Sequence, residues 1–404
     1  MDNHSNSTNG TSNQPLAAVV VGGGAAGIAV VGNLLEALSP TSSIAWVDYQ
    51  FLGGRINAKY REVPSNTKVC HFLSYGQGVE PFKKIAEDTP KPNAIATLED
   101  LPHGDTCSLQ YAGDMLQMLS DGLLKHDRVT SWRGTVTDAE WDSESSTWSL
   151  TIKDDVPNVI QRPKAPLVVY CTGALPTISP LPTALSRTPI ILALDIFLKP
   201  SLLAETLPRD RDMCVGVIGA SHSAVLVLMN LFTLSQDSHP QLRVRWFSRA
   251  RNLKYAEDKG DWILYDNTGL KGVAAQFAQE HLDGDKLLHS DVGKIITRVD
   301  CSGGEEQETQ AYLQEMPACE YVTQAIGFHT TPLPMKQKVS FDHETGGFID
   351  QKTRQPVPGL FGAGIGFPER VVDPLGNVEY AVGFIKFMRF LKRVVPGWVD
   401  TSKK

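Results

Sequence analysis

A glycine-rich turn and a carboxylate are the residues of this sequence whose types and spacing best fit a chemical role. The turn matches G-x-G-x-x-G through Gly22, Gly24 and Gly27, and Asp48 follows further along the chain. In such a turn the first glycine permits a tight bend, the second lets backbone approach a pyrophosphate, and the third lets helix pack on strand. The N–H groups and positive dipole end of the helix would hold the pyrophosphate, and Asp48 would accept hydrogen bonds from an adenosine ribose.

This chemistry requires a strand before the turn, a helix after it and a second strand that ends in the acid. Residues 17–21 form an apolar run, residues 28–38 a helical run and residues 44–47 a second apolar run that ends at Asp48. The uncharged stretch 16–35 also resembles a membrane span, but residues 1–15 contain no Lys or Arg and a triple glycine interrupts the stretch. Spans carry a positive flank and glycine weakens a helix, so a dinucleotide site is the favoured interpretation.

A second unit of the same kind has a less regular turn. An apolar strand at 213–218 leads into Gly219, Ser221 and Ser223, and a helix at 225–234 and a strand at 242–247 follow. Ser221 replaces the second glycine, so the backbone would approach a pyrophosphate less closely, although both hydroxyls could donate hydrogen bonds to it.

Two arginines follow this second strand where the first unit has an aspartate. Cations at the position of Arg249 and Arg251 suit the 2′-phosphate of NADPH better than the bare ribose of NADH. Solvated loop arginines are the alternative interpretation.

Composition limits the class of protein. With 404 residues, 42% of them hydrophobic, the chain can bury two cores, and its net charge of −7 argues against nucleic acid or an anionic membrane as partner. Its six cysteines form no C-x-x-C pair, which indicates a reducing, cytoplasmic location and no metal site. Residues 1–15 lack an apolar segment and predict a disordered tail.

Two similar strand exits indicate how the two units are connected. Residues 166–173 and 321–327 each form a buried strand followed by a glycine, and together they bracket the second unit. We therefore expect an α/β fold with two Rossmann-like dinucleotide-binding domains, the second inserted into the first. The expected boundaries are a tail at 1–15, the first domain at 16–180 and 326–404, and the inserted domain at 181–325.

The remaining segments supply further elements and candidate residues. A polar loop at 60–68, which follows Gly53, Gly54 and Arg55, could carry function or be a surface connection. A helix is expected at 115–125, and antiparallel meanders at 129–160 and 287–323. A final helix is expected at 377–394, ended by Pro396 and Gly397, and its start at Asn377 and Val378 is a candidate anion site.

Two dinucleotide units in this order resemble the two-dinucleotide-binding-domain flavoproteins over nearly the whole chain. In that superfamily the first unit binds FAD and the second NADPH, and the exits at Gly173 and Gly327 resemble its crossing strands. The absence of C-x-x-C separates the chain from its dithiol reductases. The loop at 53–68 resembles the segment that runs over the flavin in the single-component FAD- and NADPH-dependent monooxygenases, with Asn66 matching an asparagine near the reactive edge. Arg55 stands where that branch usually has Trp, and the Baeyer–Villiger fingerprint is absent.

The resemblance implies an FAD-dependent enzyme in which NADPH reduces the flavin, O₂ adds at flavin C4a and a small organic substrate is oxygenated, in specialised metabolism. It implies a catalytic hydrogen bond from Asn66. The expected cofactor-binding residues are Gly22, Gly24, Ala26, Gly27, Asp48, Gly53, Arg55, Gly173, Gly219, Ser221, Ser223, Arg249, Arg251, Gly327, Gly364, Asn377 and Val378.

Several alternatives remain open. An NADPH-dependent flavin reductase or an oxidase would share every cofactor motif, and a nonenzymatic flavin-binding protein would fit a decayed second turn. His71 and His103 are acid–base candidates, although a structural role is more common for such residues, and His222 lies inside the second turn. A homodimer is compatible with the sequence.

Overall fold

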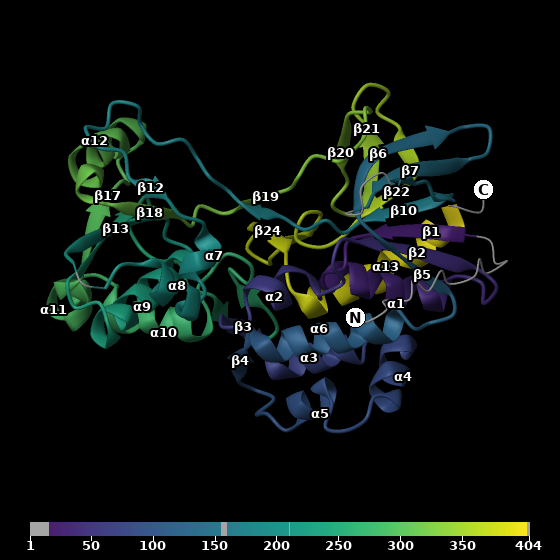
Figure 1. Ribbon diagram of the computed structural model, residues 1–404, viewed down its shortest axis with the longest axis horizontal. Helices are drawn as coiled ribbons and strands as arrows, with labels where there is room; N and C mark the ends of the chain where they lie inside the picture. The colour runs from purple at the N-terminus through teal and green to yellow at the C-terminus, as the bar shows by residue number, and fades with distance from the viewer. Residues whose placement is uncertain (1–15, 155–159, 210, 402–404) are drawn as a thin grey trace, which may run out of the picture.

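The computed structural model describes residues 16–154, 160–209 and 211–401, so the tail expected at 1–15 lies outside the described residues. Figure 1 shows two units side by side, each with its own sheet and helices, joined by long connections. The larger unit contains both ends of the described chain, and the smaller unit contains its middle part.

A seven-stranded sheet with the order β20-β21-β22-β10-β1-β2-β5 forms the centre of the larger unit. Its strands are β1 (Leu16–Val21), β2 (Ser43–Asp48), β5 (Val129–Arg133), β10 (Leu167–Tyr170), β20 (Val339–Phe341), β21 (Gly347–Asp350) and β22 (Pro356–Gly362). Strands β22, β10, β1, β2 and β5 run parallel, and β20 and β21 add an antiparallel edge. Because β22 follows the smaller unit in the chain and pairs with β10, which precedes it, the smaller unit is inserted into the larger one.

Alternate residues of the central strands pack into two cores, which is why these strands are apolar on both faces. Val19 and Val168 face an antiparallel meander formed by β6 (Thr135–Asp142), β7 (Thr147–Lys153), β8 (Ile160–Gln161) and β9 (Lys164–Ala165). Val20 and Val169 face a helical layer. That layer consists of α1 (Ala25–Ala37), α2 (Gly54–Lys59), α3 (Val69–Gly76), α4 (Glu80–Asp88), α5 (Ala94–Glu99), α6 (Leu109–Leu123) and α13 (Phe384–Thr401).

The smaller unit has a five-stranded parallel sheet with the order β12-β18-β13-β14-β17. Its strands are β12 (Ile190–Ile191), β13 (Met213–Ile218), β14 (Leu242–Ser248), β17 (Ile296–Asp300) and β18 (Tyr321–Gln324). Its helices are α7 (Leu194–Phe197), α8 (Pro200–Thr206), α9 (His222–Asp237), α10 (Gly272–His281), α11 (Lys286–His289) and α12 (Glu305–Glu315), with 3₁₀ turns at Asp291–Lys294 and Met316–Ala318. The two Rossmann-type sheets and the insertion confirm the predicted fold class.

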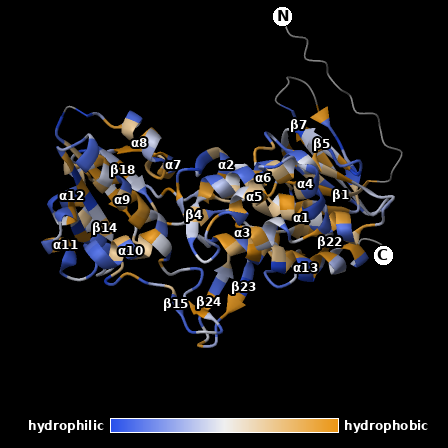
Figure 2. Ribbon diagram, turned by 90° about the horizontal axis from the view of Figure 1, so that it is seen from below, coloured by the Kyte–Doolittle hydropathy of each residue, from blue (hydrophilic) through white to orange (hydrophobic). Residues whose placement is uncertain are grey.

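Short strand pairs connect the units and line the space between them. The crossing strands β11 (Leu175–Pro176) and β19 (Phe328–His329) pair antiparallel. The other pairs are β3 (Pro64–Lys68) with β4 (Thr106–Ser108), β15 (Glu257–Asp258) with β16 (Ile263–Leu264), and β23 (Glu369–Val372) with β24 (Val378–Ala381). Figure 2 shows β15, β23 and β24 close together between the two units.

The predicted bounds of the last helix are wrong at both ends. The last helix begins at Phe384, because Asp373 accepts hydrogen bonds from Asn377 in a turn that makes Val378 the first residue of β24. Asn377 and Val378 therefore do not form the start of that helix. It also continues past Pro396, because Trp398 and Val399 are buried in the core.

The meander expected at 287–323 is also wrong. That segment contains parallel strands β17 and β18 on either side of α12, whose acidic first turn favours a helix. The meander at 129–160 is confirmed for β6 and β7, while β5 instead forms the parallel edge of the large sheet. Among the described residues, no helix is both long and apolar enough to span a bilayer.

Replacing Gly27 tests the packing of the first turn. A Cβ on Gly27 would lie 1.9 Å from the carbonyl oxygen of Gly22, a backbone atom that cannot move without bending β1. We expect Gly27→Ala to lower the free energy of unfolding by about 2 kcal/mol or more. Gly397→Ala is the control, because this helical position has open space and should gain up to about 1 kcal/mol. Urea denaturation measures both, and equal stability of the two variants would contradict the packing argument.

Candidate functional site

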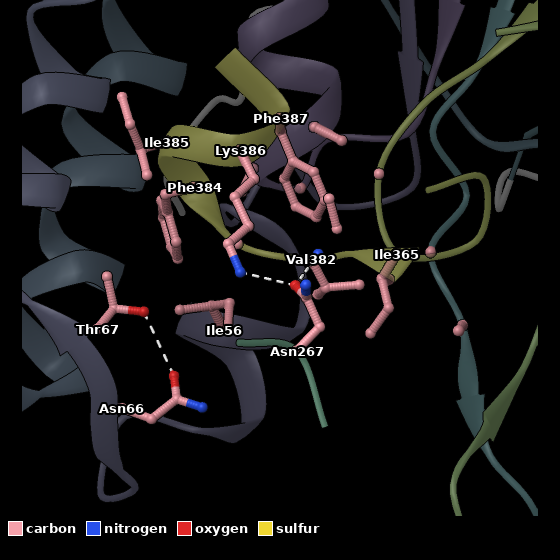
Figure 3. A pocket seen from close by; sticks show the side chains of 18 of the residues that line it. Ile56, Asn66, Thr67, Asn267, Ile365, Val382, Phe384, Ile385, Lys386 and Phe387 are labelled. Carbon is pink, nitrogen blue, oxygen red and sulfur yellow. Dashed lines mark hydrogen bonds between the residues drawn. The ribbon is translucent and has the colours of Figure 1, made fainter. Parts of the chain in front are cut away.

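One large cavity lies between the two units and has a volume of about 1800 Å³. Most small-molecule sites occupy about 300–1,000 Å³, so this cavity has room for more than one ligand. The larger unit lines it with the first glycine turn, β3 and the start of α13, and the inserted unit with the start of α9, α10 and the β15–β16 hairpin. Figure 3 shows one part of its wall, with Asn66 opposite the first turn of α13.

The first glycine turn presents bare backbone to this cavity. Gly22 has φ +116°, and a Cβ there would lie 2.3 Å from the carbonyl oxygen of Cys171 on the neighbouring strand. A Cβ on Gly24 would meet only the Cα of Gly54, at 3.8 Å, so the start of α1 stays open. A pyrophosphate can therefore approach these N–H groups, which is the fit that the sequence predicted.

Asp48 lies at the end of β2 and is fixed by backbone donors. Its Oδ2 accepts from the N–H of Gly23 at 2.7 Å, and its Oδ1 from the N–H groups of Gln50 and Phe51 at 2.8 and 2.7 Å. The carboxylate also lines the cavity. Carboxylate oxygens accept more than one hydrogen bond, so this arrangement holds an acceptor ready for a ribose hydroxyl.

Gly364, which follows β22 near the end of the chain, packs against the first glycine turn. Gly364 has φ +93°, and a Cβ there would lie 2.5 Å from the Cβ of Ala26 at the start of α1. Gly53, Gly173 and Gly364 line the cavity, whereas Gly327, Asn377 and Val378 do not.

The helix dipole expected at Asn377 and Val378 is instead supplied by Gly383 and Phe384, where α13 begins and which line the cavity. The N–H of Phe387 donates to the carbonyl of Gly383 at 2.9 Å, which marks the first turn of this helix. The sequence missed this start because the spacing of apolar residues in β24 also fitted a helix.

Arg55 connects the two units. Its guanidinium lies 2.7 Å from Asp195 on α7 and 2.9 Å from the hydroxyl of Tyr60. Burial, partly offset by Arg55, raises the pKa of Tyr60 to about 12, so its hydroxyl stays protonated and donates to Asp195. Arg55 lines the cavity as expected, but its interactions indicate an interdomain contact that the sequence did not predict.

Asn66 is exposed to the cavity on β3. The hydroxyl of Thr67 donates to its side-chain oxygen at 3.3 Å, as Figure 3 shows. No part of the chain that the structure describes accepts a hydrogen bond from the Asn66 amide nitrogen. The amide N–H₂ group is therefore available to a ligand.

The second turn repeats the packing of the first. Gly219 has φ +129°, and a Cβ there would lie 2.3 Å from the carbonyl oxygen of Ala325 on the neighbouring strand. In both units a buried tryptophan donates to the carbonyl of the first glycine, Trp46 to Gly22 at 3.0 Å and Trp246 to Gly219 at 2.7 Å. Sequence reasoning missed both tryptophans, although each lies two residues before the end of its strand.

The cavity reaches only part of the second turn. His222 and Ser223 line it, whereas Gly219, Ser221 and the two arginines do not. Arg249 forms an ion pair with Glu308 at 2.8 Å, yet 77% of its side chain is exposed. Arg251 reaches Ser302 at 3.4 Å. Both arginines therefore follow β14 and lie outside the lining of this cavity.

The three histidine candidates differ in whether they line the cavity and in their hydrogen-bond partners. The Nε2–H of His103 donates to the carbonyl of Glu99, 3.1 Å away, and His103 does not line the cavity. His71 lines it. His222 also lines it, and its buried Nδ1 has no hydrogen-bond partner among the described residues. Burial, followed by the charge of Lys271, lowers the pKa of His222 to about 4, so this imidazole is neutral near pH 7.

Fold and site thus define a protein with two dinucleotide-binding domains that share one cavity. No protein-family model matches the chain. It is 50% identical over 393 residues to Monooxygenase AgnR1 of Paecilomyces divaricatus, which covers 96% of this chain and 98% of that relative.

Solved structures share the fold over 96% of this chain. They include an ornithine N-hydroxylase from Kutzneria sp. 744, with TM-score 0.60, 13% identity and 100% of that chain covered. A cadaverine monooxygenase from Erwinia amylovora has TM-score 0.59, 11% identity and 94% of that chain covered. The chain belongs to the family of Monooxygenase AgnR1.

Acid pH tests the state of His222. Its pKa is about 4 in the folded chain against an ordinary 6.5, so between these values only the unfolded chain binds the proton, and stability rises with pH. From pH 7 to pH 4, we expect the wild type to lose on the order of 3 kcal/mol more than His222→Asn does. Urea denaturation of both proteins at several pH values measures this difference. Parallel pH profiles would show that His222 is not buried in its neutral form.

Proposed function

We propose that this cavity is where FAD, reduced by NADPH, and O₂ together oxygenate a small organic substrate. The observation that carries the proposal is that the first glycine turn and the start of the second, at His222 and Ser223, line the same cavity. Two dinucleotides held by these turns would direct their reactive ends into one space. Family membership supports the reaction class.

The residues of the larger unit fit FAD. The open backbone at Gly22 and Gly24 would hold the pyrophosphate, and Asp48 would hold the ribose. When bound, FAD supplies hydride acceptance and O₂ activation, which no side chain can provide. The start of α13 at Gly383 and Phe384 directs a positive helix dipole into the cavity and would stabilise negative charge there.

Asn66 is the proposed catalytic hydrogen-bond donor. Its amide N–H₂ lies in the cavity, opposite the apolar side chains of Ile365, Val382 and Phe384 (Figure 3). An apolar wall excludes water, and in such surroundings a single donor has a larger electrostatic effect than in bulk water. Asn66 would thereby hold activated oxygen beside the substrate.

Gly219, Ser221, Ser223, Arg249 and Arg251 are the proposed NADPH contacts. The proposed domain boundaries remain 16–180 with 326–404 for FAD and 181–325 for NADPH, in agreement with the separate sheets. We further propose a cytoplasmic enzyme of specialised metabolism that acts without nucleic acid or membrane and forms a homodimer.

Measuring where the atoms of O₂ go, together with NADPH consumption, tests the proposed function. The FAD-loaded enzyme is mixed with NADPH and ¹⁸O₂ and with a panel of aromatic acids, phenols, ketones, thioethers and amines. We expect one ¹⁸O atom in the product and one NADPH consumed for each product formed. NADPH oxidation that yields only H₂O₂ across the panel would favour a reductase or oxidase, and the absence of flavin bleaching would favour a nonenzymatic flavin protein. Asn66→Ala should release about tenfold more of the consumed oxygen as H₂O₂, because losing one donor costs about 1–2 kcal/mol.

The NADPH preference tests the two arginines. Replacing Arg249 and Arg251 together by Gln removes two candidate phosphate donors, so we expect KM for NADPH to rise about 10- to 100-fold and KM for NADH to change little. Arg243→Gln is the matched control, because Arg243 lies near the opposite end of β14 and contacts only backbone carbonyls. Steady-state kinetics with both nucleotides measures the effect, and equal changes for NADPH and NADH would contradict the assignment.

A further inference from the structure

A group of cationic side chains meets on one wall of the cavity. Its members, here called the cationic cluster, are Lys68, Lys271, Lys386 and Arg389. Lys68 precedes α3 and Lys271 precedes α10, whereas Lys386 and Arg389 lie on the first turns of α13. The cluster therefore combines residues of both units, and it forms only when they are side by side.

Carboxylates only partly neutralise the cationic cluster. Lys271 and Lys386 share the single carboxylate of Asp266, which lies 2.7 Å from the Lys386 ammonium. Glu379 accepts hydrogen bonds from Asn267 and Thr268 rather than from a lysine. The side chains of Lys68 and Arg389 have no hydrogen-bond or ion-pair partner within the described ranges. Of the four members, Lys271 and Lys386 thus have a carboxylate partner among the described residues, and they share the same one.

The pKa values of two groups on this wall are lowered by burial, and nearby cations add to the effect. Burial, followed by the charges of Arg389, Lys68 and Lys271, lowers the pKa of His71, and Asp266 opposes this effect. Burial also lowers the pKa of Lys386 despite its contact with Asp266. An ammonium whose burial is incompletely compensated would be stabilised by an additional anion. Asp105 also lines this wall, and Asp258, Asp261, Glu369 and Asp373 line the cavity from the hairpins β15–β16 and β23–β24.

Apolar side chains are exposed elsewhere in the same cavity. Ile263, Phe328, Ile365, Val372 and Val382 all line it, and between 39% and 52% of each is exposed. Large apolar side chains gathered in a concave site are typical of a surface that a ligand covers. They come from both units, as the cationic cluster does.

We propose that the substrate is an organic acid with an apolar, aromatic-sized body, and that the cationic cluster binds its carboxylate or ionised phenol. This inference rests on the proposed function and specifies the substrate class. It separates this chain from the cadaverine monooxygenase that shares its fold, since cadaverine is a diamine and cationic at neutral pH. The same cations could instead hold a phosphate of NADPH, and the experiment distinguishes these two anions.

Three probes with one body and different charges test the inference. 2-Naphthoate, 2-naphthamide and 2-naphthylmethylamine are titrated into the FAD-loaded enzyme without NADPH, and the absorbance of bound FAD reports binding. We expect 2-naphthoate to bind at least about tenfold more tightly than the amide, with the amine weakest. This readout needs no turnover, so it remains informative even if no probe is oxygenated and the proposed function fails.

Charge-removing variants on two elements locate the binding group. Arg389→Gln on α13 and Lys68→Gln before α3 should each weaken 2-naphthoate about five- to tenfold and leave 2-naphthamide unchanged. Lys392→Gln is the matched control, since this exposed lysine lies on α13 outside the cavity lining and should change neither probe. KM for NADPH should stay within twofold for all three variants.

Three results would overturn the inference. The first is equal affinity for the three probes, or no spectral response to any of them. The second is tighter binding of the amine. The third is a rise in KM for NADPH in Arg389→Gln or Lys68→Gln while 2-naphthoate binding stays unchanged, which would make the cationic cluster a phosphate site.

Discussion

The close approach of one glycine to a neighbouring carbonyl is the constraint on which both units depend. At the end of β1 the Cα of Gly22 packs against the carbonyl of Cys171, and at the end of β13 Gly219 packs in the same way against Ala325. A side chain at either glycine would overlap that oxygen, and the positive φ would add strain. Because the strands stay in contact at this edge, the chain turns at once into a helix whose first N–H groups face the cavity. The indole N–H groups of Trp46 and Trp246 donate to the carbonyls of Gly22 and Gly219 and stabilise the two turns.

The same contact explains why the two turns share one cavity. The carbonyls that pack against Gly22 and Gly219 belong to residues shortly before the crossing strands. Cys171 precedes β11, and Ala325 precedes β19. The strands β11 and β19 follow β10 and β18 after a few residues. Since β11 and β19 pair with each other, they connect the carboxyl ends of the two sheets. The N–H of Thr177 donates to the carbonyl of Gly327 at 2.9 Å and strengthens this link. Gly173 and Gly327 accordingly lie at this crossing, and of the two Gly173 also lines the cavity.

Local features of the fold were predictable from the sequence, and partners distant in the chain were not. The strand, turn and helix at each glycine motif follow from apolar runs and glycine spacing, and both appear near their expected residues. The predicted start of the last helix is wrong because Val378 and Ala381 also fit a helical period. The hydrogen bonds from Asn377 to Asp373 instead form a turn that joins β23 and β24 in a hairpin. Arg55 shows the same limit, since Asp195 lies 140 residues away and no spacing rule indicates that pair. The cationic cluster escaped prediction because its four members come from three separate segments.

Several contacts between the two units are polar, and this suits a site that must admit two ligands. Arg55 meets Asp195, Lys386 meets Asp266, and Glu62 accepts from Ser201 at 2.9 Å. Partly exposed ion pairs of this kind contribute little net stability, about 0–1 kcal/mol each. Each unit also keeps its own apolar core, with Val63 the main buried side chain that the larger unit contributes to the core of the inserted one. Stability thus resides mainly within the units, and polar contacts hold them together around the cavity. An apolar interface of the same extent would instead favour burying the surface on which the ligands must bind.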